Sequence, residues 1–130
     1  MGDVGKVVSV TPSSSRILLM SDPAFRAAVR FADSGARGVL AGSGEGRCRV
    51  EYVPHDAGVQ PGEATATAGA DGIFPPHFDV GICVRASRGS GEMTLDVEVV
   101  PRIAPRDLEA VEILLWLPPE EPPPAPSGGR

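Results

Sequence analysis

The sequence has no excess of positive charge and no long hydrophobic run. Its 130 residues include 12 lysines and arginines against 17 aspartates and glutamates, giving a formal net charge of −5. A protein that follows nucleic-acid phosphates needs a basic face, so this balance argues against nucleic-acid binding. The longest apolar runs have the length of a strand, well short of the roughly 20 residues that cross a bilayer. We therefore expect no membrane span, and the first residues lack the pattern of a signal peptide.

Cysteine is also scarce. Cys48 and Cys83 are too few for a disulfide framework, and no metal-ligand spacing surrounds them. Either the two thiols form one disulfide, or both are small apolar side chains of the core. The apolar parity of Cys48 favours core packing, whereas Cys83 has the opposite parity from Ile82 and Val84. We expect no metal and no cofactor.

What the sequence does have is alternation of apolar and polar residues, the pattern of strands with one wet face. Val97, for example, lies between Asp96 and Glu98. Glycine-rich turns separate eight or nine such segments at intervals of roughly 8–12 residues, which predicts an all-β barrel or sandwich. The apolar parity predicts a core of Val8, Val10, Ile17, Leu19, Val50, Tyr52, Ile82, Val84, Leu95, Val97, Val111 and Ile113.

Residues 21–31 fit two structures. Asp22 followed by Pro23 is typical of a helix start. Phe25, Ala27, Val29 and Phe31 nevertheless alternate with polar or small residues, as in a strand. In a chain so rich in strands, we expect a single turn at Asp22–Phe25 and a strand from about Ala27 to Phe31.

The composition changes at residue 117. Residues 117–130 contain six of the 14 prolines, and residues 118–130 have no side chain suited to a core. Proline lacks the backbone donor, so we expect an extended, disordered tail after a domain of residues 1–116. A polyproline ligand for a partner domain is the alternative.

Few residues are candidates for chemistry. His55 or His77, beside Asp56 or Asp79, would serve as the general base of a small β-barrel hydrolase, although surface-loop histidines are the simpler interpretation. A ligand-binding barrel is a further alternative, and it would need a cavity. In the loop that follows Gly72, Phe74 either caps the end of the barrel, which we favour, or contacts a partner together with Pro75 and His77.

Several short segments, in order, resemble the MreC family, the rod shape-determining proteins of bacteria. The matches are Val-Gly-Lys-Val-Val-Ser-Val at 4–10, Ser-Arg-Ile-Leu-Leu-Met-Ser-Asp-Pro at 15–23, Ser-Gly-Ala-Arg-Gly-Val-Leu-Ala-Gly at 34–42, Val-Gln-Pro-Gly-Glu at 59–63, Ala-Gly at 68–69, Phe-Pro at 74–75 and Val-Gly at 80–81. The resemblance covers about residues 4–116.

Two departures from the family pattern matter for the loops. Glu63 replaces an aspartate, and His77 stands where a glycine is usual. Because glycine at such a position often provides a positive φ, His77 predicts an altered turn or local strain. Family members also carry a membrane helix, a coiled coil and opening strands before the segment matching Val4. We therefore expect this chain to be a fragment, the product of a late-start reading frame, or a divergent short relative.

The resemblance implies a fold and a role. The fold would be two small Greek-key-like β-barrels, one of them incomplete here, with self-association into dimers or filaments. The role would be a non-enzymatic scaffold on the periplasmic side of the inner membrane that organises lateral wall synthesis. The implied partners are MreB, MreD and the elongation-specific penicillin-binding protein and glycosyltransferase. The candidate contact loop is Phe74, Pro75 and His77.

Overall fold

The computed structural model describes residues 4–44, 46–70, 74–88 and 93–103. All regular structure in these ranges is β, which confirms the predicted class. The strands are β1 (Gly5–Val10), β2 (Ser15–Leu19), β3 (Arg26–Phe31), β4 (Arg37–Gly44), β5 (Arg47–Glu51), β6 (Ala64–Thr67), β7 (Asp79–Arg88) and β8 (Leu95–Pro101). No helix in the described ranges is long and apolar enough to cross a membrane.

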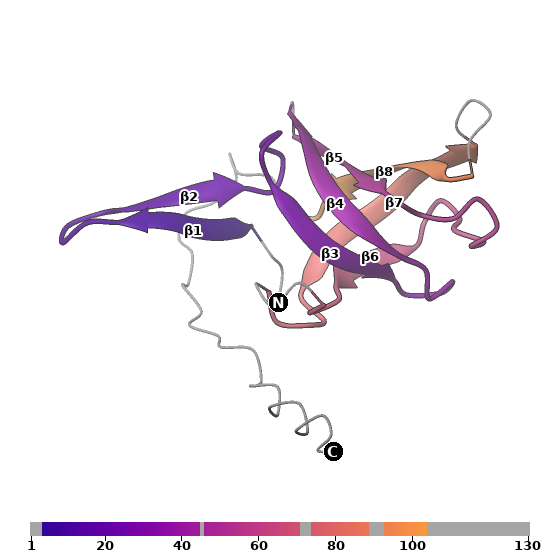
Figure 1. Cartoon of the computed structure of the whole chain (residues 1–130), viewed down its shortest axis with the longest axis horizontal. Coiled ribbons are helices and arrows are strands. Elements are labelled where there is room, and N and C mark those ends of the chain that lie inside the picture. Colours follow the sequence, from indigo (N-terminus) through magenta and orange to yellow (C-terminus); the bar gives the residue numbers. More distant parts are fainter. Residues whose placement is uncertain (1–3, 45, 71–73, 89–92, 104–130) are drawn as a thin grey trace, which may run out of the picture.

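Six strands form a closed antiparallel barrel in the order β3-β4-β5-β8-β7-β6, with β6 pairing back to β3. The remaining two strands, β1 and β2, form a hairpin that projects from one side of this barrel (Figure 1). The described part of the chain therefore holds one closed barrel and a separate two-stranded sheet. The predicted core residues Val111 and Ile113 and the proline-rich tail at 117–130 lie outside the described residues.

The segment before β3 shows how local chemistry decided between helix and strand. The Asp22 carboxylate accepts the Ala24 N–H at 2.8 Å, and the Phe25 N–H donates to the Asp22 carbonyl at 2.9 Å. These bonds close one turn, after which the chain extends into β3. The prediction of a single turn followed by a strand is confirmed.

The barrel interior is filled by side chains from every strand of the barrel. Phe25, Val29 and Phe31 are fully buried at one side, and Val50, Val97 and Val99 at the other. The buried apolar residues form one cluster: Met20, Phe25, Ala27, Val29, Phe31, Leu40, Cys48, Val50, Val53, Val59, Phe74, Val80, Cys83, Val97 and Val99. Burial of Val50 and Val97 agrees with the predicted core.

The predicted core was wrong at two places within the barrel, and each has a backbone cause. At Val84, 44% exposed, the β7–β8 register shifts between Cys83 and Arg85, so a β-bulge turns Val84 outward and leaves Cys83 inside. At Tyr52, 72% exposed, a φ of +66° breaks the alternation, and Val53 takes the inner position instead.

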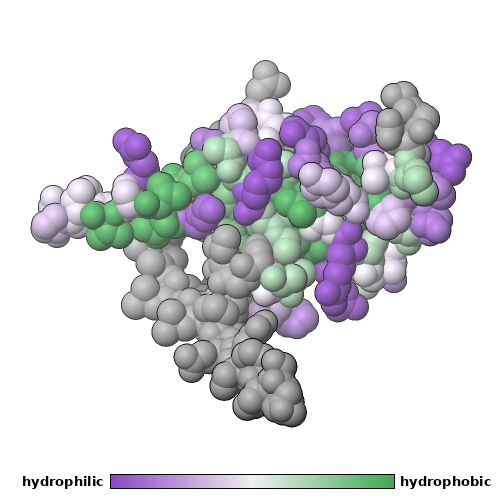
Figure 2. Space-filling view, in the orientation of Figure 1, coloured by the Kyte–Doolittle hydropathy of each residue, from purple (hydrophilic) through white to green (hydrophobic). Residues whose placement is uncertain are grey.

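The prediction was also wrong for the hairpin. Val8, Val10 and Ile17 are exposed, because the hairpin extends away from the barrel (Figure 1). The β1–β2 register shifts between Val7 and Ser9, and Figure 2 shows a hydrophobic band along the hairpin. Of the other predicted core residues, Leu19, Ile82 and Leu95 are half-buried, and Val111 and Ile113 lie outside the described residues.

Cys48 and Cys83 are both free and buried. Each is paired in register with Val99, one from β5 and one from β7, so the strand β8 lies between them. Two strand spacings amount to about 10 Å, whereas the Cα atoms of a disulfide lie about 4.4–6.8 Å apart. The core-filler interpretation is confirmed for both cysteines.

We expect neither thiol to react with Ellman's reagent in the folded protein. We also expect both thiols to stay free in an oxidising compartment. Burial raises the pKa of Cys48 to about 11 and also raises the pKa of Cys83, so little thiolate exists at neutral pH. Both thiols should titrate once the chain is unfolded in guanidinium. Rapid labelling of either thiol without denaturant would contradict the burial described here.

Candidate interaction surface

The outward face of three consecutive barrel strands is strongly basic. β3, β4 and β5 together carry five arginines and one glutamate, although the whole chain has a net charge of −5. The charged positions alternate with buried ones along β3 and β5, which places them on the outside of the barrel. We call these six residues the basic face: Arg26, Arg30, Arg37, Arg47, Arg49 and Glu51.

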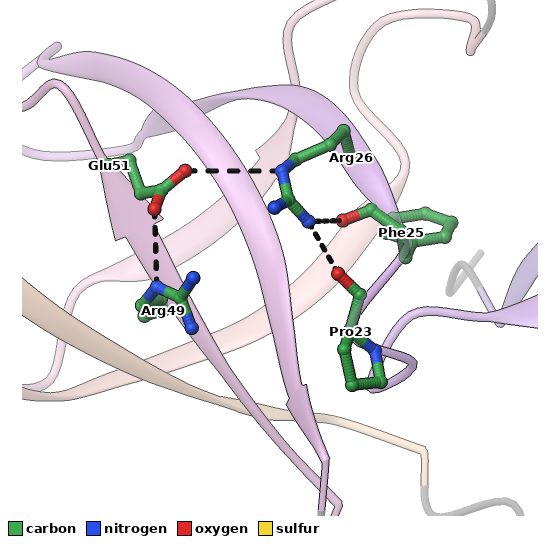
Figure 3. Close-up of polar contacts among 5 residues, drawn as sticks. All are labelled: Pro23, Phe25, Arg26, Arg49 and Glu51. Atoms are coloured by element: carbon green, nitrogen blue, oxygen red, sulfur yellow. Dashed lines mark hydrogen bonds and ion pairs between the residues drawn. The ribbon is translucent and has the colours of Figure 1, made fainter.

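One end of the basic face is held by Glu51. Its carboxylate lies 3.9 Å from Arg26 Nε on β3 and 3.3 Å from Arg49 Nε on β5, so it bridges two arginines across β4 (Figure 3). Arg26 is fixed further because its guanidinium donates to the carbonyls of Pro23 and Phe25, each at 2.8 Å. These contacts orient the arginines more than they stabilise the fold, since exposed ion pairs contribute little.

A second bridge joins β5, β8 and β7. Glu98 accepts a hydrogen bond from Arg47 and lies 3.5 Å from Arg85 Nε. The hydrogen bond from Arg47, together with the charges of Arg47 and Arg85, lowers the pKa of Glu98 below its ordinary value despite the opposing desolvation. Glu98 therefore stays ionised, and it neutralises the rim of the basic face.

Arg30 and Arg37 differ from the arginines at the bridges. They are paired directly opposite each other in the β3–β4 register, both are exposed, and in the described part of the chain neither side chain has an ion pair or hydrogen bond. The basic face thus ends in two facing cations that nothing on the described surface neutralises.

The turn that connects Arg30 to Arg37 is fixed by Glu63, which is only 3% exposed. One carboxylate oxygen accepts the N–H groups of Asp33 at 3.0 Å and Ser34 at 2.6 Å, and the other accepts the Gln60 N–H at 2.8 Å. Burial alone would raise the pKa of Glu63, but these hydrogen bonds outweigh it and lower the pKa. The longer side chain at the position expected to hold aspartate therefore serves as a buried loop clamp.

The three residues of the predicted contact loop differ in how exposed they are. Phe74 is buried, and its ring lies against Phe25 with centroids 5.5 Å apart, in agreement with the barrel-capping interpretation. Pro75 is half-buried, and its carbonyl accepts the Thr67 hydroxyl at 2.5 Å. His77 is exposed at a φ of +72°, which confirms the strained turn predicted for it. The contact role of Phe74, Pro75 and His77 stays a prediction, with His77 offering the most surface.

The structure does not assemble the residues of the hydrolase alternative. Within the described ranges, the imidazoles of His55 and His77 form no hydrogen bond or ion pair with a carboxylate or hydroxyl group. His55 Nδ1 is buried without a partner there. No group of three metal-ligating side chains occurs among the same residues. A depression of about 390 Å³ beside Glu63 lies at the loop clamp, outside the barrel interior.

Sequence reasoning missed the basic face. The net charge of −5 conceals it, although the alternation of arginines with apolar residues is visible in the sequence. Whether Arg30 faces Arg37 depends on the length of the turn between them, and this register is only evident once β3 and β4 are paired. The loop clamp was likewise noted only as a departure at Glu63.

A closed six-stranded barrel with an appended hairpin and ion-paired charges on its outer surface places the chain among the small all-β barrel domains. Comparison with known proteins identifies the family. Residues 1–115 match the family model of the rod shape-determining protein MreC, barrel core, and the chain belongs to this family.

Relatives and solved structures agree with this assignment. The cell shape-determining protein MreC of Caulobacter vibrioides is 33% identical over 94 residues, which make up 72% of this chain and 27% of that protein. A crystal structure of MreC from Pseudomonas aeruginosa superposes with a TM-score of 0.73 at 29% identity, covering 77% of this chain and 65% of that one.

A third comparison concerns a complex. In the complex between penicillin-binding protein PBP2 and MreC from Helicobacter pylori, the matching chain has a TM-score of 0.62 at 17% identity. The match covers 74% of the present chain and 59% of the matched chain in that complex. At this identity the match shows a shared fold. The present chain thus spans about a quarter of the Caulobacter relative and between half and two thirds of the matched structures.

Proposed function

We propose that this chain is the barrel core of a non-enzymatic scaffold that maintains cell shape by organising lateral peptidoglycan synthesis. The observation that carries the proposal is the match of residues 1–115 to the barrel core of the rod shape-determining family. The curated relative from Caulobacter is named for the same role. The scaffold acts on the periplasmic side of the inner membrane, where the wall is built.

The partner with direct support from a relative is the elongation-specific penicillin-binding protein. The Helicobacter pylori protein of the same fold forms a complex with PBP2. MreB, MreD and the elongation glycosyltransferase are further partners that family membership supports. Self-association also stays a prediction, and the exposed Val8, Val10 and Ile17 of the projecting hairpin support it.

Binding is the activity we assign, in place of a reaction. In the proposed role a rigid barrel presents side chains to partners, and the ion-paired arginines in Figure 3 are an example of such fixed groups. Preorganised polar groups lower the entropy cost of association. The hydrolase and ligand-binding alternatives have no comparable support from the described residues.

The partner assignment is tested by measuring binding with interferometry. The ligand is the periplasmic domain of the elongation penicillin-binding protein from the same cell. We expect saturable binding by the full-length protein, including any residues that the gene encodes beyond this chain. A variant with an unfolded barrel, described in the Discussion, should lose that binding. Equal binding by the unfolded variant, or none by the wild type, would overturn this partner assignment.

A further inference from the structure

The exposed pair of Arg30 and Arg37 is unfavourable for the isolated fold. Side chains directly opposite each other on antiparallel strands have Cβ atoms about 4.5–5.5 Å apart, and like charges at such positions are destabilising. Ion pairs hold Arg26 and Arg49 through Glu51, and Arg47 and Arg85 through Glu98. Asp33, in the turn between the two strands, forms no ion pair with either Arg30 or Arg37.

The backbone that carries Arg30 and Arg37 is also held rigidly. Both arginines are on regular strands, and the Glu63 carboxylate fixes the turn between them through Asp33 and Ser34. Ala36 and Phe31 close the same turn with a backbone hydrogen bond of 2.9 Å. Two guanidinium groups carried at facing backbone positions suit the recognition of carboxylates, because each presents a planar fork of N–H donors.

From this arrangement we propose that Arg30 and Arg37 form a docking site for a carboxylate-rich segment of a partner protein. The proposal rests on the scaffold role only for the identity of that partner, which would belong to the wall-synthesis machinery. The observation that carries it is the facing, uncompensated cation pair at the end of the basic face.

A protein partner fits the surface better than an anionic bilayer does. The barrel is closed and therefore convex, so a flat membrane would meet only a narrow strip of it. Exposed Tyr52, which follows Glu51 at the end of β5, adds an aromatic side chain of the kind enriched at protein interfaces.

The test uses a hexaglutamate peptide as probe, with hexaglutamine as the neutral control, followed by backbone amide shifts in NMR. We expect shifts confined to Arg30, Arg37 and their neighbours, weakening as salt is added. The double variant R30E/R37E should lower the affinity at least about tenfold. The matched variant R16E/R88E makes the same change in net charge at two other exposed arginines and should alter affinity less than about twofold.

Stability provides a second readout that a purely structural pair would not give. The single change Arg37→Glu replaces a facing repulsion with a cross-strand ion pair, so it should raise the melting temperature by about 1–4 °C while weakening peptide binding. On a surface that serves binding, a change that stabilises the fold is expected to weaken function in this way.

Three results would overturn the proposal. These are equal affinity of R30E/R37E and R16E/R88E, a fall in melting temperature for Arg37→Glu, and binding to phosphatidylglycerol vesicles without binding to hexaglutamate. The last would assign the face to a membrane. If peptide binding maps to the pair while depletion leaves cell shape unchanged, the docking site stands and the scaffold role fails.

Discussion

Val97→Asp should unfold the barrel, whereas Val84→Asp should leave it folded. Val97 is 2% exposed, lies between Val50 on β5 and Ala86 on β7, and has no polar side chain on its inner neighbours to pair with a carboxylate. Burying an unpaired charge costs several kcal/mol, a large share of the roughly 5–15 kcal/mol that stabilises a small domain.

Val84 provides the matched control, because it undergoes the same chemical change on the neighbouring strand at 44% exposure. Its effect should stay within about 1 kcal/mol. Thermal unfolding followed by circular dichroism compares the two variants. Similar melting temperatures would contradict the assigned β-bulge, since alternation without the bulge would place Val84 inside.

Glu63→Gln should destabilise the protein by about 2–3 kcal/mol. The amide keeps the shape of the side chain but removes the charge and presents an NH₂ group to one of three backbone N–H donors, which leaves a buried donor without an acceptor. Chemical unfolding in urea measures the loss. Glu98→Gln, at an exposed ion pair, is the control and should shift the unfolding midpoint by less than a third as much.

The pH dependence of stability follows from the direction of the Glu63 shift. The folded state holds its pKa below the ordinary value of 4.5, so the stabilisation is fully present above 4.5 and is lost as pH falls through the lower folded-state pKa. Glu63→Gln should therefore flatten the acid limb of the stability profile. Parallel acid limbs for the variant and the wild type would contradict the loop clamp.

Most of the fold could be predicted because a barrel strand has one face inside and one in water. Apolar and polar residues therefore alternate along each strand, as in Cys48-Arg49-Val50. The strands predicted from this alternation are present where the structure describes them. It fails where the backbone departs from regular pleating. The apolar–polar alternation of the sequence gives no sign of the bulge at Val84 or of the positive φ at Tyr52.

The surface was less predictable because it depends on register between strands. Six residues separate Arg30 from Arg37, and a shift of one residue in the turn between the strands would remove the facing pair. The strain at His77 was predictable from the residue type at a turn position where glycine is expected, whereas the clamp at Glu63 depends on loops far apart in the sequence.

Cell shape after depletion tests the scaffold role most directly. In the cell that encodes this protein, depletion should widen or round the cells and disperse new wall synthesis, as followed by fluorescent D-amino acid labelling. The wild-type gene and Val84→Asp should restore the normal width, and Val97→Asp should not. Depleted cells that keep their width and pattern of wall insertion, or full rescue by Val97→Asp, would contradict the proposed function.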